Sequence, residues 1–139
     1  MYDTILVPTD GSDSANRAVE HGLSLAAQYD ATLHTMYVVD TSRYGEPALS
    51  STELVLQQLE DRGAELVGEI VDRAENEGIE THTRVCHGRP DREIIGYADE
   101  VDADLIVMGY QGHSHDMEGH MGSIASRVTS SAGRPVMTA

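Results

Sequence analysis

Four small residues near the carboxyl end of the chain carry the clearest chemical signal in the sequence. Gly109 and Gly112 follow the apolar run 104–108, and nine further residues separate them from Gly122 and Ser123. Glycines allow a backbone to approach a ligand closely because they have no Cβ. A Gly-Ser pair that opens a helix presents unpaired N–H groups and the positive end of the helix dipole, which favour an anion. The residues predict an anion site directly after a strand.

The elements that must position this site alternate along the chain. We expect strands at residues 4–7, 32–39, 80–86, 104–108 and 134–138, and helices that begin near Ser12 or Asp13, near Ser51, at Pro90 and at Gly122. Short apolar strands that alternate with helices predict an α/β fold, a doubly wound five-stranded parallel sheet with helices on both faces. Ligands of such sheets bind at the carboxyl ends of the strands, where the strand order reverses.

Length and composition predict one domain that spans residues 1–139. The chain is 40% hydrophobic but has no Trp and no Phe, so its core is expected to be aliphatic. The single cysteine, Cys86, excludes an internal disulfide and is typical of a reducing compartment. The sequence shows no signal peptide and no apolar run of about 18 residues, so we expect a cytoplasmic protein with no membrane partner.

The charge balance is strongly acidic. There are 24 Asp and Glu residues against nine basic ones, all nine of them arginine, and the formal charge is −15. Such a chain repels itself at low salt, and high salt screens the repulsion. The absence of lysine favours adaptation to a salt-rich cytoplasm, as in a halophile, over an acidic protein from an ordinary cell. Without a basic patch, nucleic acid is not an expected partner.

Three further segments, in the right order, resemble the universal stress protein family. They are residues 5–12, 86–90 and 103–109, and the spacing G-x2-G-x9-G-[ST] resembles the signature of the ATP-binding branch of that family. The resemblance covers essentially the whole chain. It implies strand order 3-2-1-4-5 in a Rossmann-like sheet of the adenine nucleotide alpha hydrolase-like type. This order leaves the last strand, Val136–Thr138, at an edge, and we predict a homodimer through it.

The resemblance also implies a ligand and its site. The ligand would be ATP, or ADP or AMP, with Mg²⁺ or Mn²⁺ on the phosphates. Asp10 would bind the ribose or the adenine edge, although Asp-Gly is also a turn signal. The backbone of Val38 would meet adenine, although this residue can also be an ordinary buried valine. The implied binding residues are Pro8, Thr9, Asp10, Val38, Met108, Gly109, Gly112, His113, Gly122, Ser123 and Ile124.

The segment between the second and third glycines departs from the family pattern. Residues 113–121 carry no Lys or Arg near the expected phosphates, which favours AMP or ADP over tight binding of a triphosphate. His113, His115 and His120 could instead bind a transition metal, but their spacing matches no zinc motif and favours a solvated loop. Arg127, one turn into the last helix, could reach a phosphate, but we expect it to form a surface salt bridge.

The motifs of several enzyme classes are missing from the sequence. A Walker A loop needs a lysine and the chain has none, and no dinucleotide fingerprint follows the first strand. We find no set of nucleophile, base and orienting residue, so we predict no catalytic residues. The preferred function is an adenine-nucleotide-binding sensor or switch of the stress response. The alternatives are an interaction module of the same fold that binds no nucleotide, a slow nucleotide hydrolase, and a metal sensor that uses the histidines.

Overall fold

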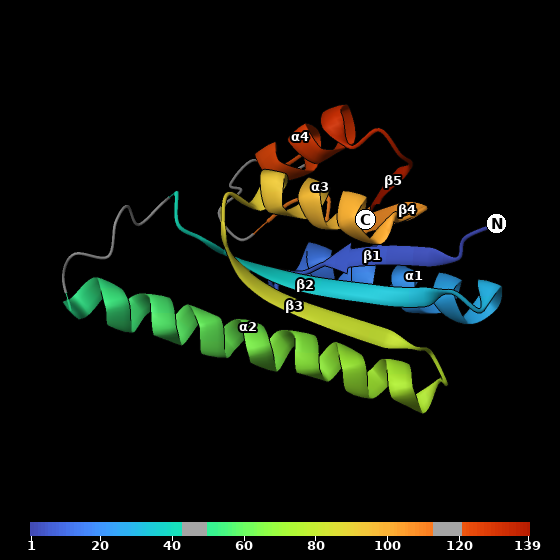
Figure 1. Ribbon diagram of the computed structural model, residues 1–139, viewed down its shortest axis with the longest axis horizontal. Coiled ribbons are helices and arrows are strands. Elements are labelled where there is room, and N and C mark those ends of the chain that lie inside the picture. The colour runs from blue at the N-terminus through green and yellow to red at the C-terminus, as the bar shows by residue number, and fades with distance from the viewer. Residues whose placement is uncertain (43–49, 113–120) are drawn as a thin grey trace.

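Five parallel strands form one sheet in the computed structural model, which describes residues 1–42, 50–112 and 121–139 (Figure 1). The elements are β1 (Thr4–Pro8), α1 (Asp13–Tyr29), β2 (Thr32–Asp40), α2 (Ser50–Asn76), β3 (Thr81–Gly88), α3 (Pro90–Val101), β4 (Leu105–Met108), α4 (Ser123–Ser131) and β5 (Val136–Thr138). The strand order is β3-β2-β1-β4-β5. The predicted order 3-2-1-4-5 is confirmed.

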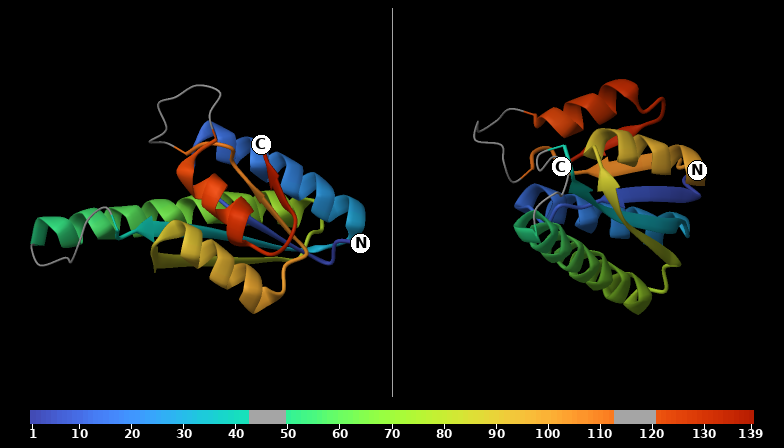
Figure 2. Two further views of the ribbon diagram at one scale, coloured as in Figure 1. Left: turned by 90° about the horizontal axis from the view of Figure 1, so that it is seen from above. Right: turned by 60° about the vertical axis from the view of Figure 1, so that its left-hand side comes forward.

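Helices cover both faces of the sheet, as predicted (Figure 2). Side chains alternate across a strand, so Ile5 and Val7 of β1 point to one face and Leu6 to the other. Ile5 and Val7 pack in a core with residues of α1 and α2. Leu6 packs in a second core with residues of α3 and α4. The sheet is therefore the central layer between two helix pairs, and the chain has the expected doubly wound α/β architecture.

The order of the strands reverses at β1. This strand pairs with β2 on one side and with β4 on the other, in parallel. The chain leaves β1 towards one edge of the sheet and returns to its other side at β4. The loops after β1 and β4 consequently diverge at the carboxyl ends of the two strands, which is where ligands of such sheets bind.

Some boundaries differ from the sequence-based prediction. The last strand begins at Val136 and not at residue 134. Pro135 has no N–H to donate to the ladder, which delays the start of that strand. The helix predicted from Gly122 begins at Ser123, with Gly122 as its N-cap. Of the two candidate caps of α1, Ser12 is the one observed, and its Oγ accepts a hydrogen bond from the N–H of Ala15.

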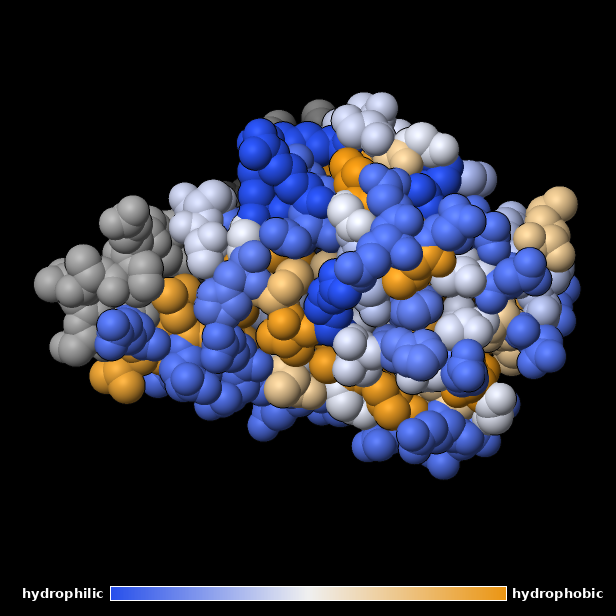
Figure 3. Space-filling model, in the orientation of Figure 1, coloured by the Kyte–Doolittle hydropathy of each residue, from blue (hydrophilic) through white to orange (hydrophobic). Residues whose placement is uncertain are grey.

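Hydrophilic residues dominate the surface seen in Figure 3, where hydrophobic residues occur as separate patches. Among the large hydrophobic residues that the structure describes, Leu54 of α2 is the most exposed after Met1, at 65%. Among the described helices, none is both long and apolar enough to cross a membrane.

A histidine cluster lies where α3 covers β2 and β3, near the amino ends of these strands and away from the carboxyl ends. The Nδ1 of His34 and the hydroxyl of Tyr97 are 3.0 Å apart, and the ring of His34 stacks on His82. Arg84 lies over the ring of Tyr97. Burial lowers the pKa of His34 from its ordinary value of 6.5, and the charges of His82 and Arg84 lower it further, against an opposing effect of Glu80. The folded protein therefore favours neutral His34.

We expect the free energy of unfolding to fall as the pH decreases below about 6.5. The unfolded chain binds a proton at His34 at a higher pH than the folded chain does, so acid favours unfolding between the ordinary pKa and the lowered one. Urea unfolding from about pH 8 to about pH 5 measures this slope. His34→Gln should flatten it, whereas His21→Gln, on the exposed side of α1, should not. Equal slopes for His34→Gln and the wild type would contradict the prediction.

Candidate functional site

A pocket of about 770 Å³ opens at the carboxyl ends of β1, β2 and β4. Its volume lies in the range that holds small ligands. The structure brings ten of the predicted binding residues to its wall: Pro8, Thr9, Asp10, Val38, Met108, Gly109, Gly112, Gly122, Ser123 and Ile124. The predicted residue His113, and with it His115 and His120, lies outside the described residues. Within the described residues, no group of three or more His, Cys, Asp or Glu side chains could hold a metal ion.

The turn after β1 directs Asp10 towards the glycine loop. The N–H of Thr9 continues the strand pairing by donating to the carbonyl of Met36 at 2.9 Å. The Oδ1 of Asp10 accepts from the N–H of Ser12 at 2.9 Å, so the turn-forming role is confirmed. Its Oδ2 lies only 2.9 Å from the position that a Cβ on Gly112 would occupy. The two residues face each other across a gap that any side chain at position 112 would fill.

Gly109 is needed for packing inside the protein. A Cβ at this position would lie 2.7 Å from the backbone nitrogen of Ala15 and 2.8 Å from the Oγ of Ser14. The loop after β4 therefore rests directly on the first turn of α1. The sequence predicted Gly109 for close approach to a ligand, and the structure adds this second reason for a glycine.

Ser14 holds the glycine loop and was missed in the sequence. Its buried hydroxyl accepts from the N–H of Gln111 at 3.1 Å and donates to the carbonyl of Ala139 at 2.6 Å. The N–H of Tyr110 also donates to Ala139, at 2.7 Å. Three distant segments thus meet at one point. The sequence holds no signal for it, because Ser14 looks like any serine in a first helical turn.

The N-terminus of α4 is held against the loop and lacks a side-chain cap. The N–H of Gly122 donates to the carbonyl of Tyr110 at 2.8 Å, which fixes the start of the helix beside the pocket. Gly122 offers no side-chain oxygen, unlike Ser12 at α1. Within the part of the chain that is described, nothing accepts a hydrogen bond from the N–H groups of residues 123–125. These donors, with the hydroxyl of Ser123, are available to an anion.

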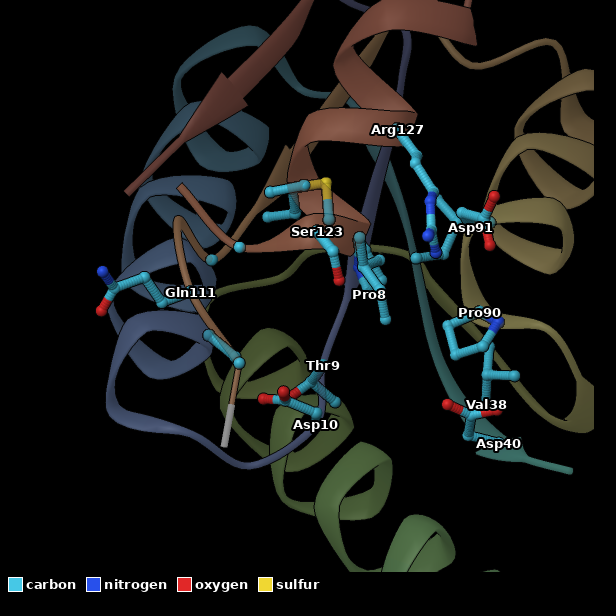
Figure 4. A pocket seen from close by; sticks show the side chains of 18 of the residues that line it. Pro8, Thr9, Asp10, Val38, Asp40, Pro90, Asp91, Gln111, Ser123 and Arg127 are labelled. Carbon is cyan, nitrogen blue, oxygen red and sulfur yellow. The ribbon is translucent and has the colours of Figure 1, made fainter. Parts of the chain in front are cut away.

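The opposite end of the pocket carries much of its apolar surface. Figure 4 shows Val38 and Pro90 on one side of the pocket and Gln111 on the other, with Pro8 and Ser123 between them. Met36, Ile94 and Met108 add buried apolar surface to the wall. Such a wall suits a flat ring system, while the N-terminus of α4 suits a negatively charged tail. The pocket therefore has the two kinds of surface that a nucleotide needs.

A polar cluster from α3 and α4 lines the same pocket. Arg89 donates through Nε to the Oδ1 of the buried Asp91 at 2.9 Å. Arg127 extends from α4 towards this pair (Figure 4). The salt bridge expected for Arg127 is absent from the described residues, so that expectation is wrong. The nearby carboxylate, that of Asp91, is already bound by Arg89.

Comparison with known proteins now identifies the family. The sequence profile of the Universal stress protein family matches residues 1–139. The chain belongs to this family. Universal stress protein MJ0531 of Methanocaldococcus jannaschii is 38% identical over 138 residues, which cover 99% of this chain and 81% of that protein.

Solved structures of universal stress proteins have the same fold. The structure of MJ0577 from the same archaeon superposes with a TM-score of 0.87 at 25% identity, covering 99% of this chain and 94% of the other. A second structure, of a universal stress protein in complex with cAMP, gives a TM-score of 0.68 at 28% identity, covering 98% of this chain and 94% of the other. Similar members of the family thus include at least one that binds an adenine nucleotide.

Proposed function

We propose that this universal stress protein binds an adenine nucleotide in the pocket at the ends of β1, β2 and β4. The phosphates would lie at the N-terminus of α4, and the base between Val38 and the start of α3. The observation that carries the proposal is the free set of N–H groups at residues 123–125, beside an open pocket. A nucleotide in a similar member of the family supports it.

Gly112, Ser123 and Asp10 would have distinct roles in this complex. The bare backbone of Gly112 leaves room for the ligand beside Asp10. Ser123 would donate both its N–H and its hydroxyl to a phosphate oxygen. The carboxylate of Asp10, whose Oδ1 accepts from the N–H of Ser12 in the turn, would also accept from a ribose hydroxyl.

The charges of the pocket favour ligands with few phosphates. Asp10, Asp40 and Asp91 line it, against Arg89 and Arg127 among the described residues. A triphosphate would meet a net negative wall, so we propose that AMP or ADP binds without a metal ion and that ATP binds with Mg²⁺ or Mn²⁺ on its phosphates. Charge repulsion at short range in a partly enclosed pocket is a strong effect.

We propose that binding acts as a switch and not as turnover. No histidine, cysteine or lysine is among the described residues that line the pocket, so this wall offers no ordinary general base beyond its carboxylates. Because β5 lies at the edge of the sheet, we also propose that two copies of the chain form a homodimer through Val136–Thr138.

The acidic residues of the pocket wall favour one rival function, an interaction module of the same fold that binds no nucleotide.

Direct binding measurements test the proposal. We expect purified protein to release an adenine nucleotide on denaturation, identified by chromatography of the supernatant. We also expect saturable heats of binding for AMP and ADP at high salt, and for ATP in the presence of Mg²⁺. If the protein releases no nucleotide and shows no measurable heat with any of the three, the result supports the rival interaction module.

A further inference from the structure

We infer that Arg127 is the side chain that supplies positive charge to the phosphates of the bound nucleotide. This inference rests on the proposed function and adds a specific ionic contact to it. The helix N–H groups carry only partial charges. In a protein with a formal charge of −15, a full positive charge beside the phosphates would offset the repulsion of an anionic ligand.

The position of Arg127 places its side chain in the pocket. It follows Ser123 by four residues in α4, so the two side chains lie on the same side of the helix. Both line the pocket. Figure 4 shows the side chain of Arg127 running from α4 along the pocket wall. A long guanidinium side chain in this place can reach an anion at the start of its own helix.

Arg127 also forms no salt bridge with any residue that the structure describes. Within the described residues, salt bridges occupy five arginines: Arg62, Arg73, Arg84, Arg89 and Arg134. Arg17, Arg92 and Arg127 have no such partner there, and of these three only Arg127 lines the main pocket. Arg89 lines it as well, but Asp91 already neutralises its charge.

The chemistry of the guanidinium fits a phosphate. Its N–H groups can donate two parallel hydrogen bonds to phosphate oxygens, and it keeps its charge at all working pH values. Together with the N–H groups of residues 123–125, Arg127 would surround a phosphate from two directions. The contact requires no proton transfer and no metal ion.

Calorimetry with adenosine, AMP and ADP tests the inference. We expect Arg127→Gln to weaken AMP and ADP binding about tenfold or more, as for the loss of a charged hydrogen bond, and to leave adenosine binding unchanged. Arg92→Gln is the matched control, because Arg92 is exposed on α3, has no salt-bridge partner among the described residues and does not line the nucleotide pocket. Both variants lose one positive charge. The difference between their nucleotide affinities therefore measures the effect of where the charge lies and not of the net charge.

The outcomes separate the inference from the function on which it rests. Partial recovery of AMP affinity in Arg127→Lys would support a contact through charge. An equal loss for adenosine and AMP would indicate a structural role of Arg127, and equal affinities of Arg127→Gln and Arg92→Gln would place the phosphates elsewhere. Either result would overturn the inference while nucleotide binding stands. A wild-type protein that binds none of the three ligands would overturn both.

Discussion

Gly112→Val is expected to weaken nucleotide binding about 100-fold, which corresponds to roughly 2.7 kcal/mol. A Cβ at this position would lie 2.9 Å from the Oδ2 of Asp10, closer than ordinary contact allows. The branched side chain would therefore displace Asp10 and occupy the gap through which the ligand is proposed to contact the loop. The backbone of Gly112 does not have a positive φ, so the substitution does not force valine into the left-handed region.

The control for this variant is a valine placed where nothing crowds it. Gly68 lies in α2, has no atom within 4 Å of the position of a Cβ and does not line the pocket. Titration calorimetry with ADP measures both variants, and thermal unfolding confirms that each is folded. Gly68→Val should bind like the wild type. If Gly112→Val is folded and also binds like the wild type, the nucleotide does not lie against the glycine loop.

Gly109→Ala is expected to destabilise the fold by roughly 3 kcal/mol, the upper end of ordinary overpacking effects. The added methyl would lie 2.7 Å from the backbone nitrogen of Ala15 and 2.9 Å from the backbone carbon of Ser14. Backbone atoms cannot rotate away as a flexible side chain can. The loop after β4 must therefore move off α1, which also breaks the hydrogen bond from Gln111 to Ser14.

Gly96→Ala should instead increase the free energy of unfolding. Gly96 is an exposed residue inside α3, with nothing within 4 Å of the position of a Cβ. Alanine stabilises a helix interior by about 0.8–1.0 kcal/mol relative to glycine. Urea unfolding of the two variants beside the wild type provides the comparison. A Gly109→Ala variant as stable as Gly96→Ala would show that the loop does not pack on α1 as described.

The sequence was sufficient for the arrangement of strands and helices. Apolar runs of strand length alternate with helical patterns, and this periodicity is local information. It placed every element of the sheet, with errors of a few residues at the ends such as Arg134, where Pro135 interrupts the ladder. The order of the strands came from the resemblance to the family, because pairing of distant strands leaves no mark in either segment alone.

The candidate site was predictable where the chemistry depends on one residue and its neighbours in the chain. Glycines at 109 and 112 and the pair Gly122 and Ser123 mark a turn and a helix start, and the ends of β1 and β4 follow from the alternation of elements. Their roles in binding stay predictions. The role of Arg127 could not be assigned in the same way, since whether an arginine has a salt-bridge partner depends on residues such as Asp91 from another helix.

Contacts between distant segments appear in no local pattern. Ser14, Gln111 and Ala139 meet because α1, the loop after β4 and the end of the chain converge beside the pocket. His34 and Tyr97 meet because α3 covers β2. Local residue patterns set the periodicity of each element and the conformation that each glycine allows. Packing of elements far apart in the chain sets which side chains are buried, which charges are paired and which helix end remains free for a ligand.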